Sequence, residues 1–128
     1  NGSPEIEENY KLDIMHGEYK LFYEEGQLQL LQTYEEGALT GVSTKYYPSG
    51  QIAEKVHFDN GQENGPFIEY YPNGAIHWEG AYLNGDNEFG LLKEYDDKGE
   101  LIKKMMCDSM AVCRTIWTIE EGDIKPKY

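Results

Sequence analysis

The stretch GPFIEYYPNGAI, residues 65–76, contains the pattern on which most of the chain is built. Within it, Tyr71-Pro72-Asn73-Gly74 fits a type I turn, because proline sets φ at the second position and glycine takes the positive φ that closes a three-residue hairpin loop. Tyr47-Pro48-Ser49-Gly50 has the same arrangement 24 residues earlier. Both segments therefore predict the turn of a β-hairpin.

Outward from this stretch, the same residue types recur about every 24 residues, with one spacing of 25. The glycine columns are Gly17, Gly41, Gly65 and Gly90; Gly26, Gly50, Gly74 and Gly99; and Gly37, Gly61 and Gly85. The aromatic and aliphatic columns are Phe22, Tyr46, Tyr70 and Tyr95; Tyr23, Tyr47 and Tyr71; Tyr34, Phe58 and Tyr82; and Leu28, Ile52, Ile76 and Leu101. Because independent columns keep one register, the chain is a repeat array.

The predicted fold is all-β: about four antiparallel β-hairpin repeats with a 24-residue period, forming an elongated meander sheet that is open or curled. Four hairpins correspond to about eight strands, and capping strands are expected at both ends. One domain spans residues 1–128. Its repeats cover about 17–40, 41–64, 65–89 and 90–110, between an N-terminal half-repeat at 10–16 and a degenerate C-terminal cap at 111–128. A second, longer turn is expected at residues 37–41 and at its copies.

Alternation of side chains along each strand assigns the columns to faces. With Tyr46 opposite Ile52, these two columns share a face, and the Phe58 column joins them by parity. That face is predicted to be the packed side, because its columns stay large and apolar. The other face, with the Tyr47 column and Phe67, is mixed in character and is expected to be half covered by water.

Composition excludes several classes of protein. The chain has 128 residues, 11 of them tyrosine and 14 glycine, and a formal net charge of −13. A disordered acidic tail lacks aromatic residues, a nucleic-acid-binding domain needs the opposite charge, and no run of residues approaches the length of a membrane span. The acidic excess either keeps an open sheet soluble or steers a basic partner.

The chain shows no set of residues that predicts chemistry. His57 and His77 occupy different repeat columns and no nucleophile recurs with them, so we expect no enzyme, no cofactor and no metal. Cys107 and Cys113 flank five residues across the last hairpin and are either disulfide-bonded or a pair of reduced thiols. No export signal is visible, which slightly favours the cytoplasm, while export after signal removal stays open.

The pattern Gly-x-x-x-x-Tyr-Tyr-Pro-Asn-Gly-x-Ile, followed by further aromatic and glycine positions, resembles the variant MORN repeat over residues 10–101. It is also similar to bacterial proteins of the YwqK antitoxin type, which are built from this repeat. The resemblance implies a β-hairpin array that binds something, and it implies no reaction. MORN repeats at large are associated with membranes and with protein scaffolding. Ser43 departs from the pattern, which favours a large aromatic residue at that position.

These observations predict a non-enzymatic protein–protein interaction module, and more specifically an antitoxin or immunity protein that neutralises a basic toxin. The residues expected to contact this partner are Tyr23, Tyr47, Tyr71, Phe67, Glu35 and Glu36. The alternative is an exported or envelope-associated structural repeat protein with bridged cysteines. No nucleic-acid partner is expected, and the acidic charge argues against direct docking on anionic lipid. The oligomeric state is left open.

Overall fold

The computed structural model describes residues 6–11, 14–85 and 87–124. Its strands are β1 (Ile6–Glu7), β2 (Tyr10–Lys11), β3 (Ile14–Met15), β4 (Gly17–Phe22), β5 (Leu28–Glu35), β6 (Ala38–Tyr46), β7 (Ile52–Asp59), β8 (Gln62–Tyr70), β9 (Ile76–Tyr82), β10 (Gly90–Tyr95), β11 (Leu101–Cys107), β12 (Cys113–Thr118) and β13 (Gly122–Asp123). No helix occurs among the described residues. The predicted all-β fold is confirmed.

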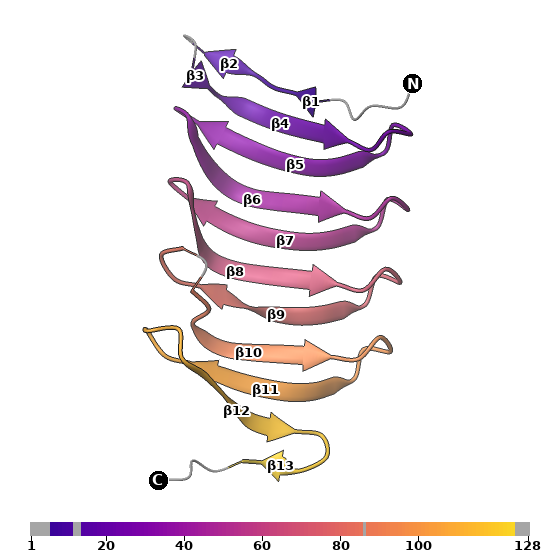
Figure 1. The fold of residues 1–128 in the computed structure, drawn as a ribbon, viewed down its shortest axis with the longest axis vertical. Helices are drawn as coiled ribbons and strands as arrows, with labels where there is room; N and C mark the ends of the chain where they lie inside the picture. The colour runs from indigo at the N-terminus through magenta and orange to yellow at the C-terminus, as the bar shows by residue number, and fades with distance from the viewer. Residues whose placement is uncertain (1–5, 12–13, 86, 125–128) are drawn as a thin grey trace.

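Eleven of these strands form one antiparallel sheet in the order β1-β4-β5-β6-β7-β8-β9-β10-β11-β12-β13, and β2 pairs with β3 in a small second sheet. The strands therefore follow one another in space as they do in the chain, and the sheet is an open, elongated meander (Figure 1). The eight strands β4 to β11 come from the four hairpins. The additional strands β1, β12 and β13 extend the sheet at its two ends, as the prediction of capping strands requires.

The turn predicted from Tyr47-Pro48-Ser49-Gly50 has the expected geometry. The Tyr47 amide donates to the Gln51 carbonyl at 2.8 Å, and the Gly50 amide donates to the Tyr47 carbonyl at 2.9 Å. Gly50 has φ of 96°, a value that favours glycine. The same two hydrogen bonds recur at each copy and once more at Asp108–Val112, where Ala111 occupies the glycine position with φ of 64°. The structure thus contains a fifth turn of this kind without its glycine.

The other turn of each hairpin differs from the expectation. The prediction of a longer turn at residues 37–41 is wrong, because only Glu36-Gly37 separates β5 from β6. Both residues have positive φ, 52° and 86°, and Asn60-Gly61 repeats this with 51° and 86°. These are the dihedrals of a two-residue turn that matches the twist of the flanking strands. The Asn-Gly dipeptide was the signal for it in the sequence.

In each of the four hairpins, one residue near the start of the second strand has no partner on the first strand. Lys45 pairs with Glu54 while Tyr46 pairs with Ile52, so Ala53 has no partner across the strand pair. The same irregularity occurs in the other three repeats, at Gln29, His77 and Ile102. A bulge of this kind shifts the alternation of side chains by one residue. The predicted sharing of one face by the Tyr46 and Phe58 columns is therefore wrong, although Tyr46 does lie opposite Ile52.

The packed face of the sheet combines columns that were predicted to lie on different faces, since Phe67 was assigned to the half-wet side and Phe58 and Tyr82 to the packed side. Register places Ser43, Val56, Phe67, Gly80, Leu92 and Met105 in one row across the strands. Phe67 and Leu92 are each only 4% exposed, and Val56 is 8% exposed. Phe58, Trp78, Tyr82 and Met105 pack against this cluster. We call this side of the sheet the pocket face, and the correction follows from the bulge in each repeat.

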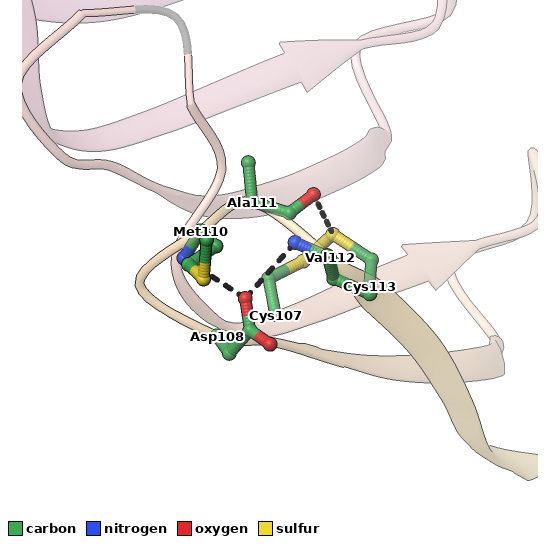
Figure 2. Close-up of a disulfide and its surroundings, with 6 residues drawn as sticks. All are labelled: Cys107, Asp108, Met110, Ala111, Val112 and Cys113. Atoms are coloured by element: carbon green, nitrogen blue, oxygen red, sulfur yellow. Dashed lines mark hydrogen bonds between the residues drawn. A yellow bond between two sulfur atoms is a disulfide. The ribbon is translucent and has the colours of Figure 1, made fainter.

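A disulfide joins Cys107 at the end of β11 to Cys113 at the start of β12, directly across the strand pair (Figure 2). Cys107 is 2% exposed and belongs to the core cluster. Within the turn that the disulfide closes, an Asp108 carboxylate oxygen accepts hydrogen bonds from the Met110 and Val112 amides at 2.9 and 3.1 Å. The last full hairpin is thus closed covalently and by these side-chain bonds.

Tyrosine hydroxyls connect each repeat to the next one. The hydroxyl of Tyr23 donates to the Tyr46 carbonyl at 2.6 Å, that of Tyr47 to the Tyr70 carbonyl at 2.5 Å, and that of Tyr71 to the Tyr95 carbonyl at 2.8 Å. The column of second tyrosines therefore has a structural role between neighbouring repeats. This role was not part of the prediction from the sequence.

Removing one of these hydroxyls should weaken the array without changing its shape. We expect Tyr47→Phe to lower the free energy of unfolding by about 0.5–1.5 kcal/mol, the usual net contribution of one hydrogen bond. Denaturant unfolding measures this change. Tyr46→Phe is the matched control, because no hydrogen bond of the Tyr46 hydroxyl occurs in the described part of the chain. Equal losses in the two variants would contradict a bridging role for Tyr47.

Candidate binding site

A pocket of about 290 Å³ opens on the pocket face toward the C-terminal end of the sheet. Its lining residues come from β8 to β12 and from the loop before β10, and they are Phe67, Glu69, Trp78, Glu88, Leu92, Met105 and Cys113. Five of the seven side chains are apolar or sulfur-containing, and two are carboxylates. The pocket thus combines apolar walls with acidic groups.

The walls of the pocket depend on a glycine that lies outside the repeat columns. Gly80 lies between Phe67 and Leu92 in the sheet. A Cβ atom at Gly80 would come within 2.2 Å of Leu92 Cδ2 and 3.0 Å of Phe67 Cε2. Glycine therefore leaves the space that these two side chains fill. One repeat earlier the sizes are reversed, since the small Ser43 lies opposite Val56.

The two carboxylates at the pocket have no ion pair with any residue that the structure describes. Glu69 lies directly opposite Glu54 on β7 and opposite Trp78 on β9. Lys45 Nζ forms an ion pair with Glu54 at 3.3 Å. Within residues 6–11, 14–85 and 87–124, neither the Glu69 nor the Glu88 side chain forms an ion pair or a hydrogen bond. Two unpaired acids therefore border an apolar recess.

Two ionisable groups at this place have raised pKa values. Burial raises the pKa of the Glu69 carboxyl above its usual value, and the charge of Glu54 raises it further. The pKa of Tyr82 is raised to about 12, first by burial and then by surrounding glutamates. The Tyr82 ring packs on Phe67 with centroids 4.5 Å apart. Burial is the larger cause of both shifts, and the neighbouring glutamates add to it by disfavouring further negative charge.

The two histidines considered for chemistry have structural contacts. His77 stacks on Tyr71 with ring centroids 4.2 Å apart, and its Nε2 lies 3.4 Å from a Glu94 carboxylate oxygen. His57 Nδ1 lies 2.7 Å from the Asn64 carbonyl oxygen. No group of three or more histidine, cysteine, aspartate or glutamate residues that could hold a metal ion occurs among the described residues.

The structure brings together only part of the predicted contact set. Phe67 lines the pocket, whereas Tyr71 does not line it and stacks on His77, the residue before Trp78. Glu35 and Glu36 lie at the tight turn, at the opposite end of β5 from the turn that carries Tyr23. Partner contact by these residues stays a prediction.

Sequence reasoning missed Trp78, Leu92, Met105, Glu69 and Glu88 as pocket residues. Gly80, a glycine within a strand and outside the columns, was the available signal.

A single-layer sheet of repeated hairpins belongs to the class of β-repeat proteins. Within this class, residues 15–36 and 39–60 match the family model of the MORN repeat variant. The two matches cover the hairpins β4–β5 and β6–β7 and support a MORN-repeat protein. MORN repeats are in general non-catalytic modules that interact with proteins or membranes. No curated protein matches the chain.

The described part of the chain contains no helix long and apolar enough to cross a membrane.

Proposed function

We propose that the chain is a non-catalytic protein-binding module whose pocket face captures a basic partner. The observation that carries this proposal is the pair of unpaired carboxylates, Glu69 and Glu88, beside an apolar pocket on the packed side of the sheet. Glu69 lies opposite Glu54 on the neighbouring strand, and two like charges in this position repel each other and destabilise the sheet. A partner that brings positive charge converts this repulsion into attraction.

The more specific form of the proposal is an antitoxin or immunity protein that covers a basic toxin. The formal net charge of −13 supports it, because a strong field of one sign raises the association rate with an oppositely charged partner by about 10–10³. The sequence pattern of residues 65–76, which resembles the repeat of YwqK-type antitoxins, is the reason for proposing this specific form. The predicted contact residues outside the pocket would then border the bound toxin, and these are Tyr23, Tyr47, Tyr71, Glu35 and Glu36.

Glu69→Gln should stabilise the free protein and weaken partner binding. Folding raises the pKa of the Glu69 carboxyl above its value in the unfolded chain. The stability that Glu69 contributes is therefore fully present at a pH below the unfolded pKa, and it is lost as the pH rises through the folded pKa and the carboxyl ionises. At about pH 7 the variant should therefore be more stable by about 0.2–1 kcal/mol, the range for like charges opposite each other. The gain should disappear near pH 4, where glutamate becomes protonated. Thermal unfolding at both pH values measures it, and a loss of stability at neutral pH would contradict this account.

The binding proposal is tested with charge-matched variants. Partners are captured from the native host, identified, and their affinities measured for the wild type, for Glu69→Gln/Glu88→Gln, and for Glu120→Gln/Glu121→Gln. Both double variants lose two charges, but Glu120 and Glu121 are exposed in the β12–β13 turn. We expect at least a tenfold loss of affinity for the pocket variant and less than threefold for the control, because truncating one side of a desolvated charge pair costs about 2–5 kcal/mol. Equal losses would indicate general electrostatic attraction and would overturn the site.

The disulfide favours a second candidate, an exported or envelope-associated structural repeat protein. Such bonds persist in oxidising compartments and are rare in the cytosol. Thiol titration of the protein isolated from its native host under alkylating conditions separates the two candidates. No free thiol in the cell supports the exported form, whereas two free thiols per chain support the cytoplasmic one.

A further inference from the structure

We infer that the pocket receives one long cationic side chain, that of an arginine or a lysine, from the partner protein. This inference rests on the proposed function and adds the chemical group that the pocket recognises. It concerns the recess between Phe67, Trp78, Leu92 and Met105, with Glu69 and Glu88 as its acidic groups.

The size of the pocket suits a single side chain. At about 290 Å³ it lies at the lower end of the range for small-molecule sites, roughly 300–1,000 Å³. Sites for cofactors or extended ligands are usually larger. The pocket also opens on one face of a single-layer sheet, so a residue projecting from a flat partner surface can enter it while the surrounding residues remain in contact with the rim.

The walls match the stem of arginine or lysine. Both residues have a chain of methylene groups that packs on apolar surface while the charged group reaches a polar environment. Phe67 and Leu92 are each 4% exposed and form a fixed base, since they pack against each other over Gly80. Trp78 supplies an aromatic ring, a favourable contact for a cation. Met105 adds a flexible wall that adapts to the shape of its ligand.

The charges match the head of such a side chain. Glu69 and Glu88 are the two carboxylates of the lining, and neither has an ion pair within the described residues. Lys45 forms its ion pair with Glu54, at 3.3 Å, and not with Glu69 or Glu88. The charges of His77 and Lys45 lower the pKa of Glu69, but burial and the charge of Glu54 raise it, and the net shift is upward. Because no cation of the described residues pairs with either carboxylate, we assign this role to a side chain of the partner.

The alternative occupants differ in what they would satisfy. An apolar side chain would fill the walls but would leave two desolvated carboxylates without a partner, which is costly. A small inorganic cation would pair with the carboxylates but would leave the aromatic and aliphatic walls exposed to water. A side chain with an apolar stem and a charged head satisfies both parts of the lining.

The experiment uses the full chain with its disulfide intact and four blocked tripeptides, Gly-X-Gly, with X as arginine, lysine, citrulline or norleucine. NMR chemical shifts of the Trp78 indole and the Met105 methyl group report on the pocket. We expect saturable shifts with millimolar affinity for arginine and lysine. We expect at least tenfold weaker binding for citrulline and norleucine, which keep most of the stem but lack the charge. Glu69→Gln/Glu88→Gln should remove the response, and Glu120→Gln/Glu121→Gln should retain it.

The outcomes separate this inference from the function on which it rests. Equal binding of arginine and citrulline peptides, or unchanged shifts at Trp78 and Met105, would overturn the side-chain assignment. Capture of a basic protein that is insensitive to Glu69→Gln/Glu88→Gln would also overturn it while leaving a protein-binding role in place. Binding of the cationic peptides at the pocket without any basic partner in the host would support the side-chain assignment and contradict the proposed function.

Discussion

Leu92→Ala should lower the free energy of unfolding by about 2–5 kcal/mol, the usual cost of removing a buried leucine side chain. Leu92 is 4% exposed and belongs to a core cluster of only four buried residues. A single-layer sheet has no second layer that could collapse into the space left behind, so the cost should lie in the upper half of this range. Leu91→Ala is the matched control, because this neighbour is 40% exposed. It should cost less than 1 kcal/mol, and denaturant unfolding of both variants measures the difference.

A double-mutant cycle tests whether Leu92 and Gly80 share one space. Gly80→Ala alone should cost about 1–3 kcal/mol by overpacking, since its Cβ would come within 2.2 Å of Leu92 Cδ2. In the Leu92→Ala background the same Cβ enters the empty volume, and the substitution should cost little or become stabilising. The coupling energy should exceed 0.5 kcal/mol. Additive effects would show that the two residues do not compete for this space.

The glycines and tyrosines of the turns were sufficient to predict the fold. Tyr47-Pro48-Ser49-Gly50 specifies its own loop locally, and the equal spacing of its copies gives the meander without knowledge of any long-range contact. The faces could not be assigned in the same way. Ala53 is an ordinary strand residue by type, and only its position opposite Tyr46 and Lys45 makes it a bulge. One unpaired residue reverses the face of everything that follows on the strand.

The pocket could not be predicted because it depends on departures from the repeat. The repeat columns contain the residues that the hairpins have in common. The pocket forms where one hairpin differs from the others, at Gly80 and at the large side chains beside it. Glu69 illustrates the same limit. Its charge is visible in the sequence, but its lack of a partner follows from register, which places Glu54 opposite it and commits Lys45 to Glu54.

Reduction of the Cys107–Cys113 disulfide should lower the free energy of unfolding by about 2–3 kcal/mol, the range that chain-entropy arguments give for a short loop. It should also weaken binding at the pocket. Cys113 is part of the pocket lining, and Cys107 belongs to the core cluster that includes Leu92. The bond therefore holds the C-terminal wall of the recess against the rest of the sheet. Thermal unfolding and titration with the Gly-Arg-Gly peptide, each with and without reductant, measure the two effects.

The effect on binding shows whether the Cys107–Cys113 disulfide shapes the pocket or only stabilises the fold. Cys107→Ser/Cys113→Ser reproduces the reduced state without reductant, and Ala111→Gly in the oxidised protein is the control for the turn alone. Glycine at position 111 accepts the positive φ of 64° without strain, so this variant should keep or increase stability by up to about 1 kcal/mol. The serine variant should bind the arginine peptide at least threefold more weakly, and Ala111→Gly should leave that affinity unchanged. A serine variant that loses stability but keeps full affinity would show that β12 does not form a wall of the functional pocket.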